Sequence, residues 1–211
     1  MEDRVRVRRY VLGELETNCY LLWSPPTRQA MVIDPGGDVT EILAEMEREE
    51  LSLKVVVNTH GHADHILGNG RLVSATGAAL AVGAEDAPML IEAEANLSSW
   101  LGCAMTSPPA SRLLRHGDLV TVGGASFIVR ATPGHTPGGI SLVGEGVAFT
   151  GDTLFAGGVG RTDLPGGDET ALLLSIKREL MTLADDVLVY PGHGDATNIG
   201  RERRDNPFLI D

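Results

Sequence analysis

The sequence predicts an α/β fold in which two mixed β-sheets pack face to face and carry helices on their outer faces. Short strand-like runs recur along the chain with glycine turns between them. Two segments, 38–50 and 168–184, show the apolar spacing of amphipathic helices. Each half of the chain also follows one plan: antiparallel strands, then a helix, then an apolar strand that ends near histidine. Two sheets packed together would bury these runs.

The first half predicts five strands and two helices. Its helix at 38–50 has one apolar face, made of Ile42, Leu43 and Met46. A weaker helix is expected near 65–75. The strands are expected at 5–13, 18–24, 30–37, 53–58 and 78–83, the third of them ending at Asp34-Pro35-Gly36.

Residues 84–111 are the least patterned part of the chain. We expect a helix followed by an irregular loop that covers the functional site. Trp100 could be a lid residue or could pin this loop to the core, and the second role is preferred. The second half then resumes the pattern with strand pairs at 118–134 and 139–152.

The rest of the second half predicts a helix at 168–184 with Asp168 as its N-cap, and a final buried strand at 186–194. The polar tail is expected to be helical over 197–205. No composition typical of a linker interrupts the chain, so residues 1–211 are expected to form a single domain.

The charge balance argues against nucleic-acid and membrane partners. Lys and Arg number 17 against 29 Asp and Glu, which gives a net charge of −12. Such a chain repels nucleic acid and anionic membranes unless it carries a basic patch. The two basic clusters, at 4–9 and 201–204, are interpreted as solvated surface, because the first alternates with valine and the second is interrupted by an acid.

The cysteines and the N-terminus indicate a cytoplasmic protein. Cys19 and Cys103 have no metal-binding or disulfide-framework spacing, so both are expected to be free and buried, as in a reducing compartment. The N-terminus is charged and lacks the apolar core of a signal peptide. No apolar run approaches the length of a membrane span.

Side chains of the types that bind metals follow four of the predicted strands. Each lies in or beside a glycine-lined turn, and only His116, in a polar turn, is interpreted as an ordinary surface residue. A buried cluster of so many imidazoles would be costly without a partner. The set is His60, His62, Asp64, His65, His135, Asp152 and His193.

This ligand set contains nitrogen and oxygen and no thiolate, which favours zinc, iron or manganese. Zinc prefers about four ligands, so seven are better shared by two metals roughly 3.5–4 Å apart. A hydroxide that bridges two such cations is a nucleophile at neutral pH. Hydrolysis is therefore the expected reaction.

The segment "HGHADH" at 60–65 resembles the His-x-His-x-Asp-His signature of the metallo-β-lactamase superfamily, and the later ligands follow in its order. The resemblance covers essentially the whole chain and implies a four-layer αβ/βα sandwich with the metals at one edge. It assigns His60, His62 and His135 to a first metal. It assigns Asp64, His65 and His193 to a second metal, with Asp152 as the bridge. It also implies that His60, His62, Asp64 and Asp152 are catalytic.

Within the superfamily, segments 151–168 and 190–209 resemble glyoxalase II-like hydrolases, especially the small single-domain bacterial hydroxyacylglutathione hydrolases. Asp152 is generally missing from the β-lactamases, and the flavodiiron oxygen reductases have glutamate where this chain has His62. Ribonuclease Z-like nucleases fit an acidic chain poorly. The chain departs from full-length glyoxalase II because 18 residues after His193 are too few for that family's C-terminal helical domain.

The resemblance implies a thioester hydrolase with two divalent metals, of which zinc is the first choice and iron or manganese are alternatives. The substrate would be a small thioester, with S-lactoylglutathione as the candidate. Arg161 could bind a substrate carboxylate, or it could form a salt bridge with Asp163 or Asp168. The sequence does not indicate an oligomeric state.

Two other functions compete with the thioester hydrolase. Persulfide dioxygenases have the same fold and motif, and they would use His60, His135 and Asp152 to hold a single iron while acting on glutathione persulfide. A metal-binding module without activity is disfavoured, because all seven ligand-type residues are present.

Overall fold

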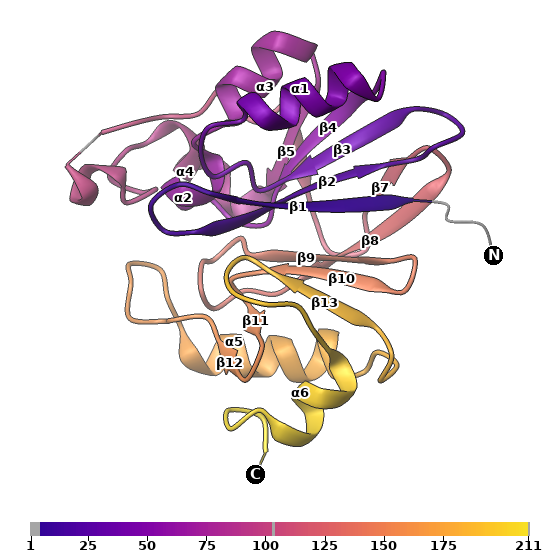
Figure 1. Ribbon diagram of the computed structural model, residues 1–211. Coiled ribbons are helices and arrows are strands. Elements are labelled where there is room, and N and C mark those ends of the chain that lie inside the picture. Colours follow the sequence, from indigo (N-terminus) through magenta and orange to yellow (C-terminus); the bar gives the residue numbers. More distant parts are fainter. Residues whose placement is uncertain (1–4, 103, 211) are drawn as a thin grey trace.

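The first sheet forms the upper part of the computed structural model, which describes residues 5–102 and 104–210 (Figure 1). Its six strands follow the chain order β1 to β6. The first three strands are antiparallel, and β3 to β6 run parallel to one another. The strands are β1 Arg6–Leu12, β2 Thr17–Trp23, β3 Gln29–Ile33, β4 Ser52–Asn58, β5 Ala79–Gly83 and β6 Arg112–Leu114.

The second sheet lies below the first and is also mixed, with the order β14-β13-β10-β9-β8-β7. Only β10 and β13 are parallel neighbours. A separate hairpin joins β11 Leu154–Phe155 to β12 Gly158–Val159. The strands of this sheet are β7 Leu119–Val122, β8 Ala125–Ala131, β9 Ile140–Gly144, β10 Val147–Gly151, β13 Leu188–Pro191 and β14 Thr197–Asn198.

The two sheets bury an apolar layer between their facing sides. Because successive side chains of a strand point to opposite faces, Tyr20 and Leu22 of β2 pack toward the second sheet while Leu21 packs outward. Phe127 and Phe149 are the large contributions from the second sheet to this layer. All five side chains are buried, which explains why the central strands appear as continuous apolar runs in the sequence.

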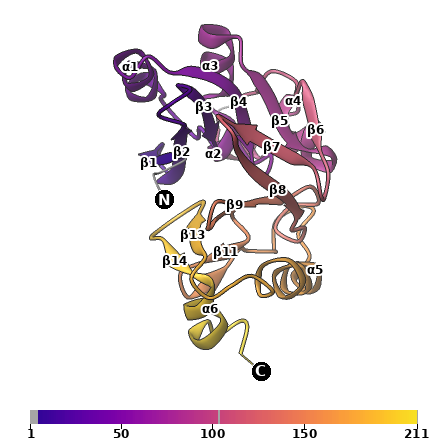
Figure 2. The same cartoon turned by 90° about the vertical axis from the view of Figure 1, so that its right-hand side faces the viewer.

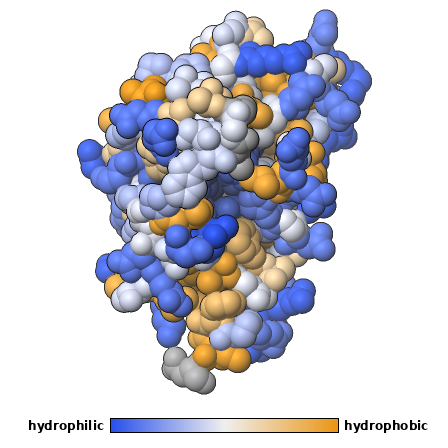
Figure 3. Space-filling model, turned by 90° about the vertical axis from the view of Figure 1, so that its left-hand side faces the viewer, coloured by the Kyte–Doolittle hydropathy of each residue, from blue (hydrophilic) through white to orange (hydrophobic). Residues whose placement is uncertain are grey.

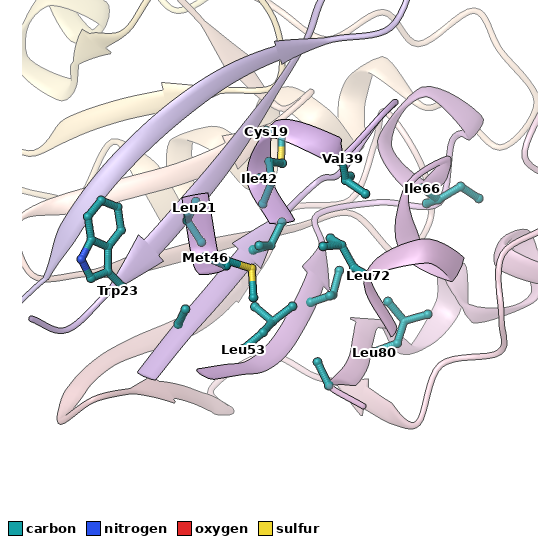
Figure 4. Close-up of a cluster of buried hydrophobic side chains, with 14 of the residues drawn as sticks. Cys19, Leu21, Trp23, Val39, Ile42, Met46, Leu53, Ile66, Leu72 and Leu80 are labelled. Atoms are coloured by element: carbon teal, nitrogen blue, oxygen red, sulfur yellow. The ribbon is translucent and has the colours of Figure 1, made fainter. Parts of the chain in front are cut away.

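Helices cover both outer faces and complete the predicted arrangement of four layers (Figure 2). Helices α1 Thr40–Arg48 and α3 Asn69–Thr76 lie on the first sheet. Ile42 and Met46 of α1 belong to the outer apolar cluster of that sheet (Figure 4), and Leu43 packs against it, as the helical spacing predicted.

The second sheet is covered by α5 Glu169–Ser175, the π-helical turn Ile176–Leu180 and α6 Ile199–Asp205. Leu172, Ile176 and Ile199 of these helices form an apolar cluster with Val189 of β13. Asp168 caps α5 as predicted, because its side chain accepts a hydrogen bond from the backbone N–H of Ala171.

The structure differs from the prediction in several short elements. The single helix expected near 65–75 is two helices, α2 Ala63–Ile66 and α3. Gly68 lies between the two helices. A β-carbon added at this position would meet the side chain of Val39 and the carbonyl oxygen of Gly37. Four short strands were not predicted, because two or three residues are too few to show the alternation of apolar and polar side chains. They are β6, β11, β12 and β14.

The segment 84–111 contains a 3-10 turn Ala84–Asp86, helix α4 Ala87–Ile91 and a second 3-10 turn Ser98–Leu101, and its other described residues are irregular. The prediction that Trp100 pins it to the core is wrong, since this side chain is 63% exposed. Cys19 is free and buried as expected, whereas Cys103 lies outside the described residues. Within the described ranges, no helix has the length and apolarity needed to cross a membrane.

Candidate metal centre

The seven ligand-type side chains predicted from the sequence meet at one end of the molecule. Four of them lie in the loop after β4 and on α2. The other three follow strands β8, β10 and β13 of the second sheet. The site therefore lies across the interface between the sheets, with His60, His62, Asp64 and His65 from the first half and His135, Asp152 and His193 from the second.

His60, His62 and His135 form one compact group, whose candidate ligand atoms all lie within 4.8 Å of one another. All three side chains are buried. The Nδ1 atom of His62 lies 2.9 Å from Nε2 of His135, and the imidazole of His60 packs edge-on against both rings.

Asp64, His65 and His193 form a second group that meets the same distance limit. Nε2 of His193 lies 3.3 Å from Oδ2 of Asp64. Asp152 stands between the two groups: its oxygens lie 3.4 Å from Nε2 of His65 and 3.6 Å from Nε2 of His135. This position is the one that a bridging carboxylate would need.

Burial and neighbouring charges set the protonation of the site. Burial and the surrounding imidazoles hold the pKa of His60 well below its usual value, and the same causes lower the pKa of His62 to about 4. His65 is buried as well, but the carboxylates of Asp64 and Asp152 raise its pKa. Burial opposes ionisation of Asp152, yet the neighbouring histidines, above all His65, lower its pKa.

Five buried polar atoms of the site have no hydrogen-bond partner among the described residues. They are Nε2 of His60, Nε2 of His62, both ring nitrogens of His65 and Oδ1 of Asp152. Buried polar groups are almost always paired, because an unpaired one costs free energy. Neutral imidazoles and ionised carboxylates are the forms that ligate metals, so the residues present fit divalent cations of the zinc, iron or manganese type.

Asp34 is a functional residue that the sequence reasoning treated only as the end of a strand. It is buried, and its oxygens accept hydrogen bonds from the backbone N–H and the hydroxyl of Thr59, both at 2.7 Å. Its Oδ2 also lies 3.1 Å from Nδ1 of His65, without hydrogen-bond alignment. Asp34 thereby supplies a counter-charge behind a ligand-type histidine, as metal sites commonly do.

Asp86 is a second residue that the sequence reasoning missed. It is fully buried and accepts hydrogen bonds from the N–H of Gly61, the hydroxyl of Thr136 and the N–H of Gly138. It follows β5 as Asp34 follows β3, and both strands are parallel neighbours of β4. A carboxylate at the end of each flanking parallel strand is the signal that could have identified both residues.

Glycine allows the backbone to approach the ligand-type side chains at Gly192. A β-carbon there would lie 2.1 Å from Oδ1 of Asp152 and 2.8 Å from Cε1 of His65. The first of these separations is far too short, so only glycine fits without movement of the site. The backbone N–H of Asn18 holds this loop by donating to the carbonyl of Gly192 over 2.7 Å.

A pocket of about 640 Å³ opens over the site. Arg161 lines it and also forms a two-pronged ion pair with Asp163, at 2.7 and 2.8 Å, whereas Asp168 is engaged as the helix cap. His116 lies on the surface away from this pocket, as predicted. The remaining residues of the pocket wall are mainly apolar.

The model of the Metallo-beta-lactamase superfamily matches residues 12–193, which is most of the chain. The chain belongs to this superfamily. Among curated metallo-beta-lactamase superfamily proteins, it is 37% identical to hydroxyacylglutathione hydrolase GloC of Haemophilus influenzae over 198 residues, which cover 92% of this chain and 93% of that protein. The chain is therefore a member of a metallo-hydrolase family, as the motif predicted.

Solved structures of this superfamily confirm the predicted αβ/βα sandwich. BLEG-1, described as a B3 metallo-beta-lactamase, has a TM-score of 0.93 at 36% identity, covering 98% of this chain and all of that one. The protein TTHA1623 in a di-iron-bound form scores 0.84 at 36% identity, covering 96% and 100%. ETHE1 from Myxococcus xanthus scores 0.82 at 37% identity, covering 96% and 83%.

Proposed function

We propose that this protein is a metal-dependent hydrolase of small thioesters. One observation carries the proposal: seven His and Asp side chains converge at the base of a pocket, and five of their buried polar atoms have no partner within the described chain. The similarity to a hydroxyacylglutathione hydrolase supports thioesters as the substrate class.

The two groups of side chains would hold two divalent metals, with Asp152 shared between them. Zinc is the first choice, and iron or manganese are the alternatives; the di-iron form of TTHA1623 supports a site for two metals. The first metal would take His60, His62 and His135. The second would take Asp64, His65 and His193.

When bound, such metals supply hydroxide at neutral pH, because they lower the pKa of a bound water to about 7, and they polarise the acyl oxygen. Asp64 is held in place for this reaction by the hydroxyl of Thr17, which donates to its Oδ2 over 3.1 Å. His65 would bind a metal as the neutral imidazole, and Asp34, whose Oδ2 lies 3.1 Å from Nδ1, would be the acceptor nearest to the remaining ring N–H. A thiolate is a good leaving group, so the chain needs no strong general acid.

The substrate proposed for the first test is S-lactoylglutathione. The acidic chain is proposed to act on small molecules in the cytoplasm, with neither nucleic acid nor membrane as a partner.

The test is hydrolysis of S-lactoylglutathione by the purified, metal-loaded protein. Asp64→Ala should lose turnover and one of the two metals. Asp186→Ala, which changes an exposed aspartate outside the pocket, should retain both and serves as the control. Metal content measured beside activity separates loss of the site from loss of folding. Absence of thioester hydrolysis in a protein loaded with two metals would overturn the proposal.

The alternative function is a persulfide dioxygenase with one iron held by His60, His135 and Asp152. The similarity to ETHE1 from Myxococcus xanthus is the reason to test this alternative function as well. Oxygen uptake with glutathione persulfide in the iron-loaded protein would support this alternative. The likeness to BLEG-1 adds a β-lactam to the substrates that should be assayed.

A further inference from the structure

The mouth of the pocket is built from apolar side chains that come from four separate segments. These are the β1–β2 turn, the irregular segment before β6, the β11–β12 hairpin and the loop that follows this hairpin. The side chains are Leu15, Leu97, Trp100, Phe155, Val159 and Leu164.

Two of these side chains are turned far into solvent: Leu15 is 52% exposed and Trp100 is 63% exposed. Figure 3 views the molecule from the end where α2 and α4 lie, and it shows apolar surface near the centre and in the lower half. Apolar surface that surrounds a pocket typically marks a ligand-binding site. Contact with an apolar ligand would remove these side chains from water.

The same mouth offers little positive charge. Arg161 is the single Lys or Arg among the described residues that line the pocket. Both prongs of its guanidinium already bind the carboxylate of Asp163, and both partners are exposed. Asp163 thus occupies two of the five N–H donors of Arg161 and offsets its positive charge, and the net charge of −12 adds no attraction for anions.

We propose that the site selects thioesters with an uncharged, apolar arm over thioesters of the anionic tripeptide glutathione. This inference rests on the thioester hydrolase proposed above and specifies its substrate class. The apolar arm could be the acyl group or the thiol group, since the same walls would bind either. The reaction is hydrolysis in both cases: water adds to the acyl carbon, the carbon–sulfur bond breaks, and a carboxylate and a thiol are released.

The test compares four thioesters on the metal-loaded protein: acetyl or hexanoyl groups joined to glutathione or to benzyl mercaptan. Each rate is divided by the rate of hydrolysis of the same compound in hydroxide, so that chemical reactivity cancels. We expect kcat/KM to rise roughly tenfold or more when either arm becomes apolar, mainly through a lower KM, because additional apolar surface is buried. The arm that produces the larger rise identifies the group that contacts the walls.

Two variants test the walls and the charge separately. Trp100→Ala should remove most of the preference for the apolar arm, whereas Leu119→Ala, which truncates an apolar side chain of β7 that is 51% exposed and outside the pocket, should leave it unchanged. Asp163→Asn frees Arg161, so it should raise kcat/KM for the glutathione thioesters about threefold and leave the benzyl thioesters unaffected. Metal content should be unchanged in all three variants.

The outcomes distinguish this inference from the function on which it rests. Hydrolysis of all four compounds with equal or better rates for the glutathione thioesters would overturn the apolar preference and leave thioester hydrolysis intact. A preference that survives Trp100→Ala would also overturn the role of the walls. If none of the four is hydrolysed, both proposals fail.

Discussion

Gly138 donates its backbone N–H to Oδ1 of Asp86 over 2.6 Å. The other oxygen of Asp86 accepts from the hydroxyl of Thr136 and from the N–H of Gly61. These donors belong to two loops, one of which holds His60 and His62 and the other His135. A single buried carboxylate from the 3-10 turn after β5 therefore links the two loops that form the first group of candidate ligands.

Asp86→Asn should loosen this link. An amide replaces one acceptor oxygen by a donor, so at least one of the three N–H or O–H groups loses its partner in a buried position. We expect about 1–3 kcal/mol lower free energy of unfolding and roughly 10- to 100-fold weaker binding of the first metal. Urea unfolding and metal competition with a chelator measure the two effects.

Asp186→Asn is the control for this change, since that carboxylate is exposed. It should leave both quantities unchanged. Unaltered metal affinity in Asp86→Asn would contradict the linking role, even if the stability of the protein fell.

Asp34→Asn should weaken binding of the second metal and leave binding of the first metal unchanged. Asp34 has a φ of +50°, which asparagine tolerates, so the backbone can stay in place. The counter-charge 3.1 Å from Nδ1 of His65 is lost, and affinity at the second site should fall roughly 10- to 100-fold. Titration with metal should then show one tight and one weak site. Two equally weakened sites would argue against this division.

Chelation of the metals should destabilise the fold. Nε2 of His60, Nε2 of His65 and Oδ1 of Asp152 are buried without a partner among the described residues, and cations would satisfy them. At a free metal concentration of about 1,000 times Kd, binding adds roughly 4 kcal/mol to the free energy of unfolding. Urea unfolding with and without EDTA measures the difference. Identical midpoints would show that the folded protein gains nothing from these metals.

Gly192→Ala should disrupt the centre by displacing a carboxylate. The new methyl group would lie 2.1 Å from Oδ1 of Asp152, so that side chain or the loop must move. We expect loss of at least one metal, measured by elemental analysis of the dialysed protein. Gly70→Ala is the matched control: it adds the same group within helix α3, where the nearest atom is 3.6 Å away, and should stabilise the protein by about 0.5–1 kcal/mol. Full occupancy in Gly192→Ala would mean that the loop shifts without cost.

Glu45 should give a pH-dependent contribution to stability. Burial opposes its ionisation, but hydrogen bonds from Tyr10, Arg48 and Arg8 outweigh burial and lower its pKa below the usual 4.5. A carboxylate with a lowered folded-state pKa stabilises the protein above about pH 4.5 and loses this effect as the pH falls through the folded-state value. Glu45→Gln should therefore cost about 1–2 kcal/mol at pH 7.

This difference should shrink toward zero as the pH is lowered below 4. Urea unfolding of the metal-free proteins at pH 7 and below pH 4 is the measurement. Chelation removes pH-dependent metal release, and the titration of the site's own side chains is common to both proteins and cancels in the difference. A constant difference across this range would assign the effect of Glu45 to packing instead of charge.

Helices and strands with a regular apolar pattern, and ligand-type residues within a spaced motif, could be predicted from the sequence. Residues 53–58 form a strand because the run Val55-Val56-Val57 suits burial on both faces, and the spacing of "HGHADH" identified its ligands. Asp86 belongs to no periodic pattern or spaced motif, and its partners Thr136 and Gly138 are about fifty positions away. Trp100 was misjudged because its exposure depends on a loop whose path no local pattern specifies.

The division of the site between the two sheets has a consequence for how the protein matures. During synthesis, the four ligand-type residues at 60–65 emerge long before His135, Asp152 and His193. Neither candidate metal position is complete until the second half has folded and docked onto the first. Stable metal uptake would therefore be a late event, and a protein that holds two metals would be one in which both halves have reached their native arrangement.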